Sequence, residues 1–133
     1  MKAPLQAIEI APDPQIRLDI ILGKKKITIR EGHRDYREGP VMLCTHIFPW
    51  AVKTTITSVR HTTVAEVTED EFWADGYGTR MEMLKDLKKF YPSLSMKSAV
   101  TVICWGDIQE GFYTDIDNIY AFAKENNLDT SYI

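Results

Sequence analysis

Hydrophobic and polar positions alternate most clearly along residues 27–30. In a strand here, Ile27 and Ile29 share one side and Thr28 and Arg30 the other, because successive side chains point to opposite faces. The isoleucine side needs a core. The polar side would hold a cation and a hydroxyl on a rigid element, where an anionic or polar ligand can bind. This segment follows a glycine and a run of cations, Gly23-Lys24-Lys25-Lys26.

Apolar or β-branched runs predict the other strands, at 5–10, 41–45, 51–67 and 99–105. The run at 51–67 is long for one strand, so we expect it to bend or to contain a hairpin near Arg60-His61.

Helices are expected where a capping residue precedes an apolar stripe. Asp13 caps a helix with Pro14 at its first position, and Gly23 ends that helix. Thr68 and Glu71 have the spacing of a capping box, and the helix that they begin ends at Asp75-Gly76.

Two further helices complete the pattern. Thr79 opens one that Pro92 ends, and Thr114 or Asp115 caps a C-terminal one. In the helix that begins at Thr79, the core positions are expected to be Met83, Leu84, Leu87 and either Phe90 or Tyr91. Met81 is also expected to pack against the rest of the fold. Strands outnumber what a doubly wound parallel sheet needs, and their links are short. The pattern favours an α+β fold, a small mixed or antiparallel β-barrel with helices packed outside.

Size and charge narrow the possibilities. A chain of 133 residues is expected to be one domain with a real core. The net charge of −3 is uneven, because residues 17–37 hold seven cations against three acids and residues 106–133 hold one against six. A basic lobe of this kind attracts phosphates locally, whereas non-specific affinity for nucleic acid should be weak.

The cysteines and the hydropathy of the chain indicate the cellular compartment in which the protein is expected. Cys44 and Cys104 read as buried free thiols, with a disulfide possible if their strands are neighbours. No run approaches the roughly 20 apolar residues of a membrane span, and the start lacks the pattern of a secretory signal. We expect a cytoplasmic protein without a membrane partner.

Three stretches carry a resemblance to a known family. A helix ending in Ile21-Leu22-Gly23 precedes Lys25-x-Ile27-Thr28-Ile29-Arg30 and a charged loop that closes on Gly39. The segments 67–76 and 84–92 follow, and then the strand 100–103. This order and spacing resembles that of ASCH domains, small β-barrels related to the PUA fold. The likeness covers about residues 8–105 and leaves 106–133 as an extension with a helix.

The resemblance implies two kinds of activity. Family members are linked to RNA binding, and a small bacterial branch removes the acetyl group from N4-acetylcytidine. In that branch the catalytic groups are a Lys and a Thr of a G-x-K-x-x-T-x-R segment and a Glu ahead of the second helix. These positions fall on Lys25, Thr28 and Asp75. Asp75 is one methylene shorter than the family's Glu, and Gly39-Pro40 stands where Gly-Asp is common.

Amide hydrolysis needs a nucleophile and groups that move protons. Thr28 would attack the acetyl carbonyl as Lys25 takes its proton, and Asp75 would protonate the leaving nitrogen. Lys25 must then be neutral, which the repulsion of neighbouring cations favours. Lys25 and Thr28 have opposite strand parity, so they converge only if Lys25 precedes the regular pleat.

The remaining candidates would bind substrate or RNA. We expect phosphate contacts from Lys24, Lys26, Arg30 and Arg34, base stacking from Trp73, and a place for Tyr77 beside the cleft between 25–30 and 75–77. Each has an ordinary alternative: the lysine run as a solvated turn, Asp75-Gly76 as a helix end, and the tryptophans as core or rim residues.

The histidines give no indication of a metal site, and no cofactor is expected. His33, His46 and His61 are far apart in the sequence without ligand spacing, so no metal and no cofactor is expected. His33 would either reach a phosphate together with Arg34 and Arg37 or lie in a surface loop. The main alternative to a hydrolase is a non-catalytic RNA-binding module. A ribonuclease is a third possibility, although the sequence shows no obvious histidine pair.

Overall fold

The computed structural model describes residues 3–4, 6–11, 13–45, 51–109, 124–125 and 127–129. The predicted C-terminal helix lies outside these residues, as do His46 and Trp50. The chain forms two compact units. Unit 1 comprises Met1–Lys24, Gly39–Ile56 and Gly106–Ile133, and unit 2 comprises Lys25–Glu38 and Thr57–Trp105. The prediction of a single domain stays a prediction.

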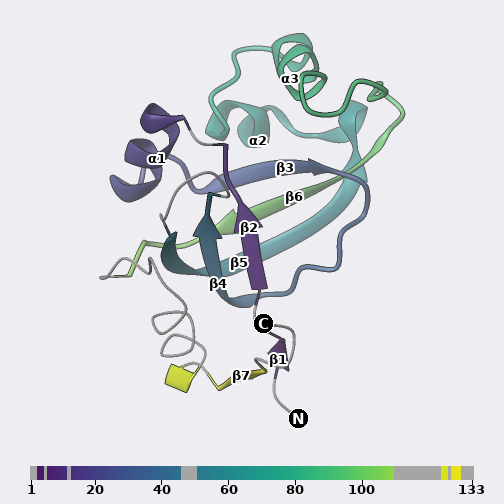
Figure 1. Cartoon of the computed structure of the whole chain (residues 1–133). Helices are drawn as coiled ribbons and strands as arrows, with labels where there is room; N and C mark the ends of the chain where they lie inside the picture. The colour runs from purple at the N-terminus through teal and green to yellow at the C-terminus, as the bar shows by residue number, and fades with distance from the viewer. Residues whose placement is uncertain are drawn as a thin grey trace. The chain divides into compact units, whose positions relative to one another are not determined.

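Unit 1 contains the N-terminal elements and part of the main sheet (Figure 1). Its elements are β1 (Ala3–Pro4), β2 (Gln6–Glu9), α1 (Pro14–Ile21), β4 (Gly39–Cys44), the first half of β5 (Ala51–Thr63) and β7 (Leu128–Asp129). β2 runs parallel to β4, β4 runs antiparallel to β5, and β1 pairs with β7 in parallel. The Asp13 carboxylate accepts the Gln15 N–H at 2.8 Å, which confirms the predicted cap of α1.

Unit 2 contains β3 (Ile27–Glu31), the second half of β5, a short 3-10 turn η1 (Val64–Glu66), α2 (Glu69–Ala74), α3 (Arg80–Leu87) and β6 (Ala99–Trp105). β3 and β6 are antiparallel, with Thr28 opposite Ile103 and Arg30 opposite Thr101. The five-stranded sheet has the order β2-β4-β5-β6-β3 and mixes parallel and antiparallel pairs. None of the helices in the described ranges is long and apolar enough to cross a bilayer.

The β-branched run at 51–67 does not contain the hairpin that was one of its two expected forms. β5 is a single strand of 13 residues that continues through Arg60-His61, so the hairpin considered there is absent. The reason is local: valine and threonine favour the extended backbone, and positions 60–61 carry no glycine, proline or asparagine to turn the chain.

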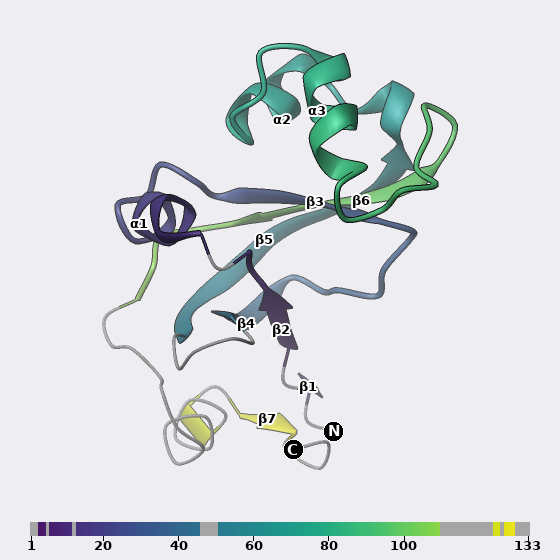
Figure 2. The ribbon, with the colours of Figure 1, turned by 45° about the horizontal axis from the view of Figure 1, so that its top comes forward.

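The core of unit 2 lies between its two helices and the β3–β6 ladder. Figures 1 and 2 show α2 and α3 side by side over this ladder. The buried cluster is Ile27, Ile29, Val64, Val67, Phe72, Met83, Leu87, Leu94, Val100 and Val102. Ile27 and Ile29 thus face the core as predicted. Met81 does not, since its side chain is 63% exposed and α3 turns its Met83 and Leu87 side chains inward. Of the two alternatives at the end of this helix, Tyr91 packs against the cluster and Phe90 is 61% exposed.

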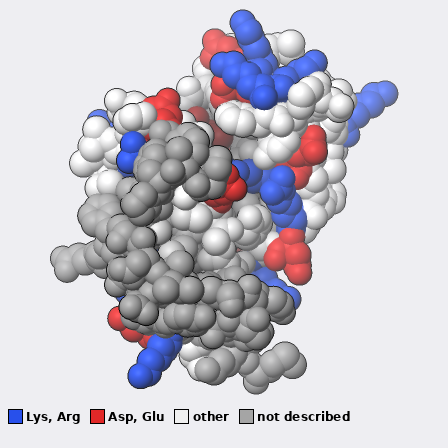
Figure 3. Space-filling view, in the orientation of Figure 1, with Lys and Arg blue, Asp and Glu red and all other residues white. Residues whose placement is uncertain are grey.

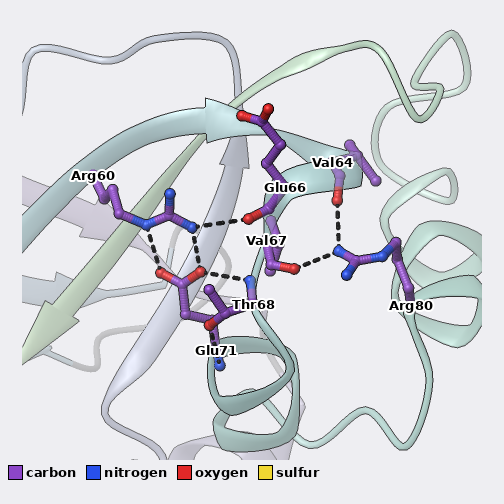
Figure 4. Close-up of polar contacts among 7 residues, drawn as sticks. All are labelled: Arg60, Val64, Glu66, Val67, Thr68, Glu71 and Arg80. Atoms are coloured by element: carbon purple, nitrogen blue, oxygen red, sulfur yellow. Dashed lines mark hydrogen bonds and ion pairs between the residues drawn. The ribbon is translucent and has the colours of Figure 1, made fainter.

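One arginine joins β5 to the start of α2, and another joins the start of α3 to the η1 turn (Figure 4). Arg60 donates to both carboxylate oxygens of Glu71, and Glu71 also accepts the Thr68 N–H at 2.8 Å, which completes the predicted capping box. Arg80 donates to the carbonyls of Val64 and Val67. These bonds fasten the first turns of both helices to the segment that follows β5.

Candidate functional site

The side chains of Lys25 and Asp75 meet although they lie 50 positions apart. The Lys25 ammonium donates to Asp75 Oδ1. Their side chains are 19% and 6% exposed, so the ion pair is largely removed from water. An ion pair at this depth is costly to build unless its partners fit closely, and such pairs often mark functional sites.

Local backbone structure explains how these two groups are presented. Lys25 lies after the Gly23 turn and two residues before β3 begins, outside the regular pleat. This meets the condition under which it can face the same side as Thr28. Asp75 is the C-cap of α2, and Gly76 adopts a φ of +93° that a side chain rarely allows. The turn at Gly76 therefore ends the helix with the carboxylate directed inward.

Burial dominates the electrostatics of Asp75. Removal from water raises the pKa of its carboxyl, while the charges of Lys25 and Arg30 and the hydrogen bond from Lys25 oppose that rise. The negative charge of Asp86 adds to it. Asp75 consequently holds a proton at a higher pH than an ordinary aspartate.

Thr28 and Arg30 form the second part of the site. Arg30 Nε donates to Thr28 Oγ1 at 3.0 Å, and the threonine side chain is buried. Because the guanidinium supplies the donor, the hydroxyl keeps its own proton free to give away. A charged donor on this oxygen also stabilises negative charge that develops there.

Tyr77, two residues after Asp75, forms a contact with Asp86 that the sequence did not predict. Tyr77 Oη donates to Asp86 Oδ2 at 2.6 Å, and Lys89 Nζ lies 3.2 Å from the other carboxylate oxygen. Burial and this hydrogen bond raise the pKa of the Tyr77 phenol. The phenol, proposed as a substrate contact, is thus already bonded within the protein. Helical spacing gives Asp86 no special position, so only the fold reveals its role.

The other predicted binding residues are dispersed. Trp73 is 53% exposed, packs edge-on against Phe72 and donates its indole N–H to the Gly78 carbonyl at 3.3 Å. Arg34 is held in the loop after β3, where its Nε donates to the Glu31 carbonyl at 2.8 Å. Lys24 is exposed, and Lys26 is half-buried with its carbonyl accepting the Trp105 N–H at 3.0 Å.

The histidines correct a sequence expectation. His33 and His61 are not apart in space, since their rings stack with centroids 4.8 Å apart and planes at 16°. His33 Nε2 bonds the Thr62 carbonyl at 3.2 Å, and His61 Nε2 bonds the Arg34 carbonyl at 2.8 Å. A strand and a loop 28 positions apart bring them together, which sequence spacing does not reveal. Parallel stacked rings do not point at a common ion, so the pair fastens the loop to β5.

Comparison with solved structures identifies the fold. An ASCH domain from Lactobacillus crispatus JV V101 matches with a TM-score of 0.56 at 14% sequence identity, over 79% of this chain and 79% of that chain. A variant of an ASCH protein from Zymomonas mobilis matches with a TM-score of 0.54 at 10% identity, over 80% of this chain and 68% of that one. No family model and no curated protein matches the sequence. The chain has the ASCH-domain fold, which confirms the predicted α+β, PUA-like class.

Proposed function

We propose that the protein hydrolyses an amide on a modified nucleoside such as N4-acetylcytidine. One observation carries the proposal: the two side chains that the resemblance assigns to proton transfer, Lys25 and Asp75, form a buried ion pair within an ASCH fold. Thr28, the assigned nucleophile, is buried on the strand that Lys25 precedes, with its oxygen bonded by Arg30.

The first half of the reaction cleaves the amide. As bound substrate displaces the remaining water, the proton of the Lys25 ammonium passes to Asp75 along their hydrogen bond, since desolvation disfavours two charges. The Lys25 amine then accepts the Thr28 hydroxyl proton as that oxygen attacks the acetyl carbon. Asp75 gives its proton to N4 as the C–N bond breaks, which releases cytidine and leaves an acetyl ester on Thr28.

The second half restores the enzyme by the same proton route. Lys25, again neutral after passing a proton to Asp75, takes a proton from water, and the hydroxide attacks the ester. Asp75 protonates the Thr28 oxygen as the C–O bond breaks, and acetic acid leaves as acetate and a proton. Arg30 favours both steps, since its guanidinium stabilises charge on the Thr28 oxygen.

Incubation with N4-acetylcytidine tests this proposal. The wild-type protein should release cytidine and acetate, and Lys25→Ala and Thr28→Ala should each lower kcat by at least about 100-fold. Unfolding curves of both variants show whether they remain folded. Wild-type protein that gives no product with N4-acetylcytidine would remove the proposal.

The alternative is a non-catalytic RNA-binding module, which the exposed indole of Trp73 favours. Exposed tryptophans stack on unpaired bases. In that case RNA binds with a steep dependence on salt, and neither product forms.

A further inference from the structure

Three lysines of unit 2 lie at the end of α3. Figure 3 shows Lys and Arg side chains clustered over this helix. Residues 85–90 carry three lysines against Asp86 as the single acid, a balance of +2 in a chain whose net charge is −3. We call Lys85, Lys88, Lys89 and Phe90 the α3 basic patch.

Helical geometry places these cations together. Lys85, Lys88 and Lys89 are spaced i, i+3 and i+4, so their side chains neighbour one another. All three are exposed. Lys89 lies 3.2 Å from Asp86, whereas Lys85 and Lys88 form no ion pair within the part of the chain that the structure describes.

The helix dipole explains the lysines of this surface but not its exposed aromatic ring. Lysines in the last turn of a helix interact favourably with the dipole, whereas an exposed phenylalanine gains nothing from it. Phe90 is 61% exposed, with its ring centroid 6.4 Å from that of Tyr91. Cations interleaved with an exposed aromatic ring match a single nucleic-acid strand, in which phosphates alternate with stacking bases.

A hydrogen bond and an ion pair connect the patch to the candidate site. Asp75 lies two residues before Tyr77, the Tyr77 hydroxyl bonds one oxygen of Asp86, and Lys89 pairs with the other. The basic face of α3 therefore begins one side chain away from the segment that carries the buried carboxylate.

We propose that the α3 basic patch binds the phosphate backbone of single-stranded RNA, so that the substrate is a modified cytosine within an RNA strand rather than a free nucleoside. Lys85 and Lys88 contact phosphates, and Phe90 stacks on a base beside the one under attack. The claim about the substrate rests on the proposed function, whereas the binding surface stands without it.

Fluorescence anisotropy with a labelled, unmodified RNA oligonucleotide tests the surface without any chemistry. Lys85→Gln/Lys88→Gln should weaken binding about tenfold or more and lower the slope of log K against log salt by about 1 to 2. Phe90→Ala should weaken binding about tenfold. Lys124→Gln removes one charge from an exposed lysine of unit 1 and should change the slope less than Lys88→Gln does.

Specific outcomes would overturn the assignment. Lys24→Gln acting more strongly than Lys88→Gln would place the phosphate contacts on the sequence-predicted basic lobe instead. Equal displacement of RNA by polyglutamate, together with an unaffected Phe90→Ala, would make the patch a site for acidic protein.

The substrate claim needs a second measurement. Wild-type kcat/KM should be higher for N4-acetylcytidine within an oligonucleotide than for the free nucleoside, and Lys85→Gln/Lys88→Gln should abolish that preference. Equal values in the wild type would overturn the claim. If neither substrate reacts while RNA binding still depends on the patch, the proposed hydrolysis fails and the binding surface stands.

Discussion

Lys25 donates to the buried carboxylate of Asp75, and this contact joins the start of β3 to the end of α2. Lys25→Ala leaves a buried, uncompensated carboxylate, so it should lower the free energy of unfolding by about 3 kcal/mol. The double variant Lys25→Ala/Asp75→Ala should lose much less than the sum of its single variants. Urea unfolding measures all three, and strictly additive losses would contradict a coupled pair.

The length of the acid at position 75 gives a second test. The Asp75 side chain already reaches Lys25, although it is one methylene shorter than a glutamate. Asp75→Glu adds a methylene at a side chain that is 6% exposed, which should cost about 1–3 kcal/mol of stability and lower kcat. Increased activity in Asp75→Glu would mean that the carboxylate falls short of its substrate.

Local signals in the sequence predicted much of this fold. The Asp13-Pro14 cap, the Thr68 and Glu71 capping box and the turn at Gly76 each act over a few residues, and the structure contains them all. The hairpin considered within β5 is absent, because β-branched residues indicate extension but not where a strand ends.

The site was accessible to sequence reasoning only in part. Lys25 and Asp75 came from a family resemblance, since no local pattern relates residues 50 positions apart. Asp86 and the His33–His61 stack depend on how the chain folds back, so no spacing rule indicates them. Periodicity left either Phe90 or Tyr91 at a core position, and only the structure shows that Tyr91 packs inward while Phe90 is exposed.

The pH dependence of stability should reveal the contacts that the Glu71 carboxylate makes with Arg60 and Thr68. Burial alone would raise the pKa of this carboxyl, but the hydrogen bonds from Arg60 and Thr68 outweigh burial and hold the pKa below its usual value. A lowered folded-state pKa stabilises the protein above the unfolded-state value of about 4.3, and that contribution disappears as pH falls through the folded-state pKa.

Glu71→Gln should therefore be less stable than wild type by about 1 kcal/mol at pH 7, a modest figure because Arg60 is partly exposed. The difference should shrink as pH falls below about 4. Unfolding curves at several pH values measure this difference in unfolding free energy. A difference that stays constant down to pH 2 would be inconsistent with stabilisation by the Glu71 contacts.

Trp73 offers a test of base stacking. Its side chain is 53% exposed, so Trp73→Ala loses the edge contact with Phe72 and the hydrogen bond to the Gly78 carbonyl but should leave the protein folded, while the affinity for an RNA oligonucleotide should fall about tenfold. Met81→Ala, at a side chain that is 63% exposed, is the matched control and should bind like wild type. Equal effects of both variants would argue against stacking by the indole.

The rate of N4-acetylcytidine hydrolysis by Thr28→Ser and Thr28→Val tests the central claim most directly. Thr28→Ser keeps the hydroxyl that Arg30 bonds and should retain measurable turnover, whereas the nearly isosteric Thr28→Val should lose at least about 100-fold in kcat. If Thr28→Val hydrolyses the substrate as fast as wild type, this hydroxyl is not the nucleophile and the catalytic account is wrong.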